Sequence, residues 1–148
     1  MPYDKIPFVL DEIHRVLIPS GVFRLSVPDY RSPLLSKQSI YDSKSHVVGG
    51  LTTGATAFYD SKSGEAKVRF KEDGKAHVWF PKYELILDLM MRSNIRNSEK
   101  IFFYQYFFDD AQFRVDPIPE NEMFVIRSVP NDMRANGAPI SIVVDFVK

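Results

Sequence analysis

The sequence predicts an α/β fold, and three consecutive stretches carry that prediction. Apolar residues recur at helical spacing from Ile6 to Leu17, a tight turn follows at Pro19–Gly21, and the apolar run Val22–Val27 then predicts a buried strand. A helix joined by a short turn to an apolar strand is half of a βαβ unit, from which parallel sheets are built. A parallel sheet needs earlier strands, and the ten residues before Asp11 are too few to supply them.

The first helix is expected to begin near Asp4, because aspartate commonly caps the amino end of a helix. Pro7 falls within the first turn, where its missing N–H costs nothing. Gly21 lies just past the end of the helix and is the position best suited to a positive φ. Pro28 ends the following strand because proline cannot donate a hydrogen bond to a neighbouring strand.

Residues 29–64 are predicted to be irregular, since they hold most of the serine, threonine and glycine and show no clear period. Two short apolar runs, Ala66–Phe70 and Ala76–Phe80, then flank Asp73-Gly74, a dipeptide typical of tight hairpin turns. They predict a β-hairpin inserted before the next helix.

Pro81 is expected to open that helix, which continues to about Ser93 with apolar residues on one face. Three further strands are predicted at Lys100–Phe108, Met123–Val129 and Ile140–Val147. Prolines at the junctions mark where one element ends and the next begins.

Composition limits the class of protein. The 148 residues are expected to form a single domain, 1–148, and contain 45% apolar and 26% charged residues. Basic and acidic residues both number 19, which argues against a general nucleic-acid binder because such proteins need a basic surface. No apolar run is long enough for a membrane helix, no secretion signal is visible, and cysteine is absent. We therefore expect a cytoplasmic protein without membrane partners or thiolate metal sites.

The segment Arg15–Gly21 (RVLIPSG) resembles the RVLKPGG turn of class I S-adenosylmethionine-dependent methyltransferases, where it links a helix to the fifth strand of the sheet. The Val-Pro-Asp that ends at Asp29 is also common in that family. Ile18 and Ser20 depart from the usual lysine and glycine. A generic helix–strand connection in an open sheet would carry a similar glycine turn.

The resemblance implies a partial Rossmann-like methyltransferase sheet that corresponds to the C-terminal half of the domain. Trp79-Phe80 is similar to the stretch before the last helix of the family, and the final strands would be the sixth and an antiparallel seventh. Family members hold the cofactor with a glycine-rich turn after the first strand, and this sequence has no such turn. The glycines at Gly49, Gly50 and Gly54 are interpreted as a flexible loop or turn. The chain alone is therefore expected to bind no cofactor, and S-adenosylmethionine only if the missing half is supplied.

Four residues, Asp29, Tyr30, His77 and Trp79, are candidates for a position near the substrate. Asp29 follows the apolar strand, where family members often place a residue near cofactor or substrate, although aspartate commonly caps the next turn. Tyr30 and Arg31 could contact a substrate carboxylate or phosphate, or could belong to an ordinary surface loop. His77 and Trp79 are expected on one face of the predicted hairpin, where plain packing is the competing interpretation. No catalytic residue is assigned, and the three scattered histidines show no metal-binding spacing.

Two hypotheses follow for the function. In the first, the chain is the C-terminal portion of a methyltransferase, supplies substrate-side elements, and is inactive alone. In the second, it is a non-catalytic binding or assembly module that keeps the half-fold. The strand Val22–Val27 would then have an open edge, so we predict a homodimer or a partner chain that covers it.

Overall fold

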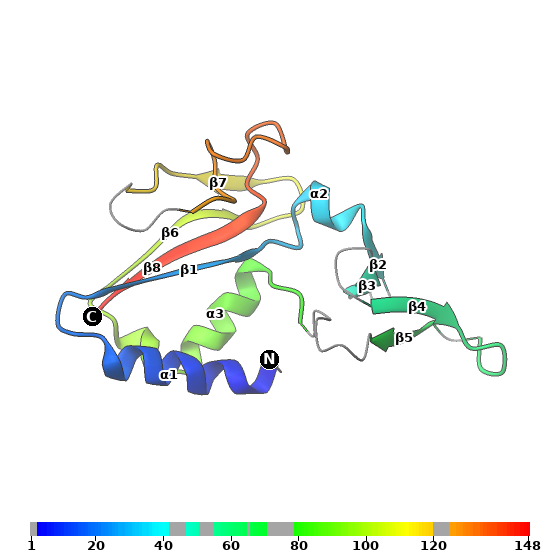
Figure 1. Cartoon of the computed structure of the whole chain (residues 1–148), viewed down its shortest axis with the longest axis horizontal. Coiled ribbons are helices and arrows are strands. Elements are labelled where there is room, and N and C mark those ends of the chain that lie inside the picture. The colour runs from blue at the N-terminus through cyan, green and yellow to red at the C-terminus, as the bar shows by residue number, and fades with distance from the viewer. Residues whose placement is uncertain (1–2, 42–46, 51–54, 65, 71–78, 120–124) are drawn as a thin grey trace.

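The computed structural model describes residues 3–41, 47–50, 55–64, 66–70, 79–119 and 125–148. The described chain contains both helices and strands, and the strands form two separate sheets (Figure 1). In chain order the elements are η1 (Tyr3–Lys5), α1 (Ile6–Val16), β1 (Val22–Pro28), α2 (Pro33–Ser36), β2 (Ser39–Tyr41), β3 (Val47–Gly50), β4 (Ala55–Tyr59), β5 (Ala66–Phe70), α3 (Tyr83–Met91), η2 (Asn94–Asn97), β6 (Lys100–Phe107), β7 (Phe113–Val115) and β8 (Ser141–Val147).

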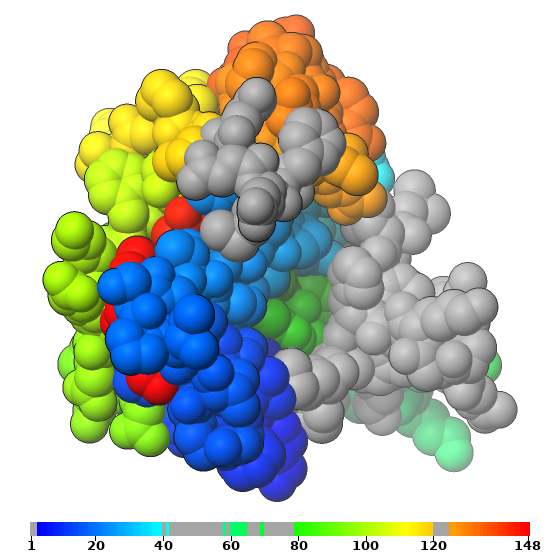
Figure 2. Space-filling model, turned by 60° about the vertical axis from the view of Figure 1, so that its left-hand side comes forward, coloured from blue at the N-terminus to red at the C-terminus, as the bar shows by residue number. Residues whose placement is uncertain are grey.

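The first sheet has the strand order β1-β8-β6-β7, and every neighbouring pair is antiparallel. Because β8 is antiparallel to both β1 and β6, those two strands run parallel to each other on either side of it. In Figure 2 the C-terminal residues (red) emerge between the N-terminal segment (blue) and the start of β6 (yellow-green). The coarse α/β prediction is confirmed, because the fold mixes helices with an open, four-stranded antiparallel sheet. The last strand of the chain, β8, is antiparallel to both of its neighbours.

One face of this sheet is covered by α1 and α3, which lie side by side beneath it (Figure 1). The apolar stripe of α1 faces the sheet as its spacing predicts, with Ile6 and Leu10 buried. The central strand β8 supplies the fully buried centre of the core through Ile142, Val144 and Phe146. The other buried members of this core are Ile86, Leu89, Met90 and Ile95.

The opposite face of the sheet carries a buried ion pair. Arg24 on β1 lies directly across from Asp145 on β8, and its Nε and Nη2 each donate to one carboxylate oxygen at 2.6 Å. Their side chains are 5% and 8% exposed. Tyr104 donates to the same carboxylate at 3.2 Å. Two donors on one planar carboxylate, both out of water, hold the register of β1 against β8.

The turn between α1 and β1 departs in detail from the expectation. The positive φ falls on Ser20, at 61°, and not on Gly21. A Cβ at Gly21 would instead lie 2.8 Å from the carbonyl oxygen of Ile18, so glycine is needed there for close approach. Ser20 donates its N–H to Lys148 at 2.6 Å, and Lys148 donates back to Gly21 at 3.0 Å. The turn therefore holds the end of β8.

The second sheet overturns the prediction of an irregular stretch at 29–64. It has the order β2-β3-β4-β5 with antiparallel neighbours, and it lies beyond α2, to the side of the first sheet (Figure 1). Gly49 and Gly50 belong to strand β3 and do not form the expected loop, whereas Gly54 lies outside the described residues.

The first strand of the predicted hairpin, Ala66–Phe70, is confirmed as β5, whereas most of the predicted second strand lies outside the described residues. Strand β5 pairs with β4, and the connecting turn runs from Asp60 to Gly64, whose φ is 69°. The predicted turn Asp73-Gly74 lies outside the described residues, and Trp79 and Phe80 are not in a strand.

Near the C-terminus, the predicted strand at Met123–Val129 is wrong over its described residues, 125–129. Residues 125–129 form turns, in which the Ser128 hydroxyl donates to the Val125 carbonyl oxygen. The buried amide of Gln105 on β6 accepts from the Val129 N–H and donates to its carbonyl oxygen. This pairing fastens the turns against the face of β6 without adding a strand. The short strand β7 was not predicted. None of the described helices is both long and apolar enough to cross a membrane.

Candidate functional site

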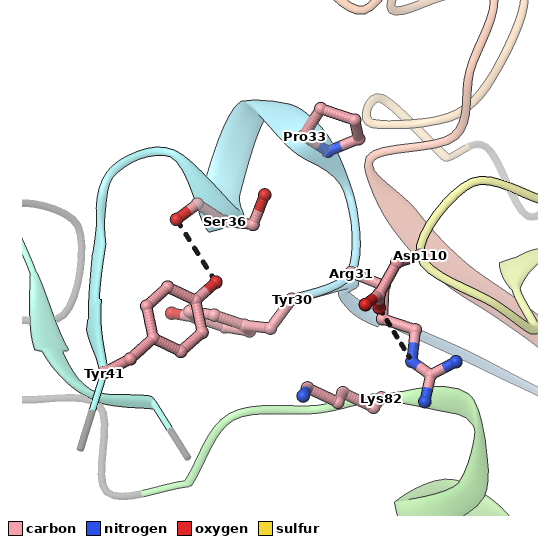
Figure 3. A pocket seen from close by; sticks show the side chains of 7 residues that line it. All are labelled: Tyr30, Arg31, Pro33, Ser36, Tyr41, Lys82 and Asp110. Carbon is pink, nitrogen blue, oxygen red and sulfur yellow. Dashed lines mark hydrogen bonds and ion pairs between the residues drawn. The ribbon is translucent and has the colours of Figure 1, made fainter. Parts of the chain in front are cut away.

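A pocket of about 450 Å³ opens at the carboxyl end of β1. In open α/β sheets this end of the strands is where ligands bind. Three regions that are far apart in the sequence meet here: the residues from the end of β1 through α2 to β2, the approach to α3, and the turn between β6 and β7 (Figure 3). The lining residues are Tyr30, Arg31, Pro33, Ser36, Tyr41, Lys82 and Asp110.

Asp29 lies beneath this pocket and is fully buried. Its Oδ2 accepts from the Phe107 N–H at 2.8 Å, and its Oδ1 accepts from the Arg31 N–H at 3.0 Å. The carboxylate thereby joins the ends of the parallel strands β1 and β6. Burial raises its pKa to about 6, against the opposing effect of the two N–H donors and the Arg31 charge. Asp29 shapes the loop that carries the pocket residues and does not itself line the pocket.

Tyr30 forms the inner wall of the pocket and is 2% exposed. Its N–H donates to the Pro81 carbonyl oxygen at 2.9 Å. Its ring meets the Phe80 ring edge-on, with centroids 5.1 Å apart. These contacts tie the end of β1 to the segment that leads into α3, and so place Lys82 opposite Tyr30.

The Arg31 side chain is held by two segments, the turn after β6 and α3. Its Nη1 donates to the Phe108 carbonyl oxygen at 2.9 Å, and its Nη2 donates to Glu84 on α3 at 2.5 Å. Its Nε lies 3.9 Å from Asp110, too far for a hydrogen bond, and this buried N–H has no acceptor. The guanidinium is therefore fixed in position with its buried Nε–H unused.

The remaining polar groups of the pocket differ in their partners. Tyr41 donates its hydroxyl to the Ser36 carbonyl oxygen at 3.2 Å, which closes one side (Figure 3). The Lys82 ammonium has no hydrogen-bond or ion-pair partner among the residues that the structure describes. Asp110 stands at the turn between β6 and β7 with its side chain 91% exposed.

The structure brings together two of the four predicted site residues. Asp29 and Tyr30 are adjacent at the pocket, as their place after the strand predicts. Trp79 packs instead against the hydrophobic core and the Tyr3 ring, whose centroid is 5.9 Å away, and does not line the pocket. His77 lies outside the described residues. Lys82, Tyr41 and Asp110 reach the site from separate segments, and no spacing in the sequence relates them to Tyr30.

Within the described ranges, no three histidine, aspartate or glutamate side chains gather closely enough to hold a metal ion. No family model matches the chain, and no curated protein or solved structure matches it either.

Proposed function

We propose that this chain is the C-terminal portion of a class I S-adenosylmethionine-dependent methyltransferase domain and supplies its acceptor-side elements. The observation that carries the proposal is the order of elements in the first sheet. A helix (α1), a glycine turn and β1 are followed by α3, β6 and a last strand that is antiparallel to both β1 and β6. This is the sequence of elements that the resemblance of Arg15–Asp29 implies.

The position of the pocket supports the same proposal. It lies beyond the carboxyl end of β1, next to Asp29, at the end of the sheet where open α/β folds bind ligands. A methyl transfer needs chiefly that donor and acceptor be held in line, so an acceptor pocket of shaped polar residues suits the role.

The described residues that follow β1 do not fit the cofactor. The connection that follows β1 runs through Asp29, Tyr30 and Ser32, all with side chains that are buried, and contains no glycine that would let a backbone approach a nucleotide. We therefore place the cofactor site outside this chain and assign no step of the reaction to it.

The free edge of β1 supports the presence of a covering strand, both in the methyltransferase proposal and in the alternative, an assembly module. Among the described residues, β1 pairs with β8 alone, so its other edge presents unpaired backbone groups. The exposed apolar side chains of Val16, Ile18 and Val22 flank the start of this edge. In the methyltransferase proposal another strand of the domain covers it. In the alternative, an assembly module, a second copy covers it.

The test compares two expression products from the same locus: this chain, and this chain extended by any in-frame sequence upstream of Met1. We expect the extended product to contain a glycine-rich strand–turn–helix and to bind S-adenosylmethionine in calorimetric titrations, whereas this chain does not. Micromolar binding by this chain alone, or no binding by the extended product, contradicts the proposal. Light scattering that shows a dimer of a chain with no upstream continuation favours the assembly module.

A further inference from the structure

We propose that the pocket at the end of β1 binds an oxyanion, a carboxylate or phosphate group of a small molecule, between the Lys82 ammonium and the Arg31 Nε–H. The claim that this small molecule is the methyl acceptor rests on the proposed function. The claim that the pocket binds an oxyanion does not.

Lys82 provides the first argument. Its side chain lines the pocket, its residue is half-buried, and its ammonium has no acceptor among the described residues. In Figure 3 its chain extends along the floor of the pocket beneath Tyr30. An ammonium group has three donors and a strong preference for water or an anion, so partial burial without a partner favours an anionic ligand.

Arg31 provides the second argument. Glu84 and the Phe108 carbonyl oxygen use its two terminal nitrogens and fix the plane of the guanidinium. The remaining Nε–H is buried, has no hydrogen bond, and faces Asp110 across 3.9 Å (Figure 3). The Asp110 carboxylate thus lies on the side from which a ligand oxyanion would approach the Arg31 Nε–H, but it is too far away to accept its hydrogen bond. Hydrogen bonds from a guanidinium to an anion are among the stronger ones in proteins.

The charges differ in their exposure. The Arg31 side chain is 20% exposed, whereas that of Asp110 is 91% exposed and lies at the mouth of the pocket. Water screens the outer charge more than the inner one. Arg31 is also paired with Glu84, whose side chain is 49% exposed and does not line the pocket. The wall that a ligand meets therefore carries two cations against one well-solvated carboxylate.

The size of the pocket indicates the kind of ligand. A volume of about 450 Å³ falls within the range of roughly 300 to 1,000 Å³ that small molecules occupy. Tyr30 and Tyr41 form two of its sides and can pack against a ring that carries the anionic group.

The experiment titrates the isolated chain, without S-adenosylmethionine, with phenyl phosphate, benzoate and uncharged benzyl alcohol. Binding is followed by amide chemical shifts in two-dimensional NMR spectra. We expect saturable shifts at residues 30–36, 82 and 110 with at least one of the two anions and none with benzyl alcohol. The anion that binds more tightly identifies the group as phosphate or carboxylate, and equal affinities indicate a general oxyanion site.

Two variants move the affinity in opposite directions. Lys82→Met should weaken binding of the better anion by about tenfold, the usual effect of losing a charge-assisted hydrogen bond. Asp110→Asn removes the competing carboxylate and should tighten binding by about two- to fivefold. Lys100→Met is the matched control: it removes the same charge from an exposed lysine at the far end of β6, and should leave the affinity unchanged.

Three results overturn the proposal: no binding of either anion, equal binding of benzyl alcohol, or weaker binding by Asp110→Asn. An equal loss in Lys82→Met and Lys100→Met would also overturn it, because it would indicate attraction by overall charge. Since no cofactor is present, failure here leaves the test of the methyltransferase proposal independent.

Discussion

Replacing Asp29 by asparagine removes a buried titratable group while keeping its shape. In the native protein the carboxylate accepts from Phe107 and Arg31 and is fully buried. Burial raises its pKa from the ordinary 3.8 to about 6. The folded protein therefore takes up the Asp29 proton at a higher pH than the unfolded chain does, and its stability must depend on pH through this residue.

The sign and size follow from the two pKa values. Between about pH 4 and pH 6 the folded state holds the proton and the unfolded state has lost it, so stability falls as the pH rises through this interval. A difference of about 2 pKa units corresponds to about 3 kcal/mol in the free energy of unfolding. The contribution is fully present below about pH 4 and is lost above about pH 6. Asp29→Asn has no such contribution.

The assay measures the free energy of unfolding of native protein and Asp29→Asn in urea at several pH values from 4 to 7. We expect the native-minus-variant difference to fall by up to about 3 kcal/mol across this range. Asp88→Asn is the matched control: Arg92 and then Tyr3 lower the pKa of Asp88 from its ordinary 3.8, so its difference should stay nearly constant from pH 4 to 7 and decrease only at more acid pH. A difference for Asp29→Asn that stays flat, or rises with pH, refutes the reasoning.

Four further substitutions and one double variant test the fold. Asp145→Asn leaves the buried Arg24 guanidinium without its carboxylate and should lower the free energy of unfolding in urea by about 3–5 kcal/mol. The double variant Asp145→Asn with Arg24→Met should lose less stability than Asp145→Asn alone, and an equal or larger loss would argue against pairing. Ser20→Gly should raise the free energy of unfolding by about 1 kcal/mol, because Ser20 has a φ of 61°. Gly21→Ala should lower the melting temperature, because the new Cβ would lie 2.8 Å from the Ile18 carbonyl oxygen. An unchanged melting temperature for Gly21→Ala would contradict this close approach. Ile142→Ala empties the fully buried centre of the core and should cost about 2–5 kcal/mol by chemical unfolding, and a cost below about 1 kcal/mol would contradict its place there.

Apolar periodicity predicts the elements that share the main core. The stripe of α1, the run at β1 and the C-terminal run at β8 all bury their apolar residues against one another, so local pattern and tertiary packing agree. The pattern misleads at Met123–Val129. That segment is apolar enough for a strand, yet Ile126 is 72% exposed and β8 already occupies the position between β1 and β6.

The second sheet and β7 illustrate a different difficulty. β2 and β7 have three residues each and β3 has four. Such short strands show hardly one cycle of alternation, so pairing with neighbours defines them and periodicity cannot. The glycines of β3 favour a turn by local preference, and strand pairing overrides that preference.

The candidate site was predictable only in part, for a similar reason. Asp29 and Tyr30 could be singled out because they follow an apolar strand, and that placement depends on neighbours in the sequence. Lys82 and Asp110 reach the pocket only through the packing of α3 and of the turn after β6. Long-range packing of this kind leaves no spacing signal in a single sequence.

The place of β8 between β1 and β6 has a consequence for biosynthesis. During translation β1 and β6 leave the ribosome before β8, the strand that lies between them. Val22 of β1 is therefore synthesised long before its pairing partner Val147 on β8. Pairings between distant parts of a chain are slow to form, and strand edges that wait for them invite association with other chains. Until β8 arrives, the nascent protein therefore exposes the two strand edges that β8 covers in the described sheet, one on β1 and one on β6. A chaperone that shields these edges should raise the yield of folded protein more than a slower rate of elongation would.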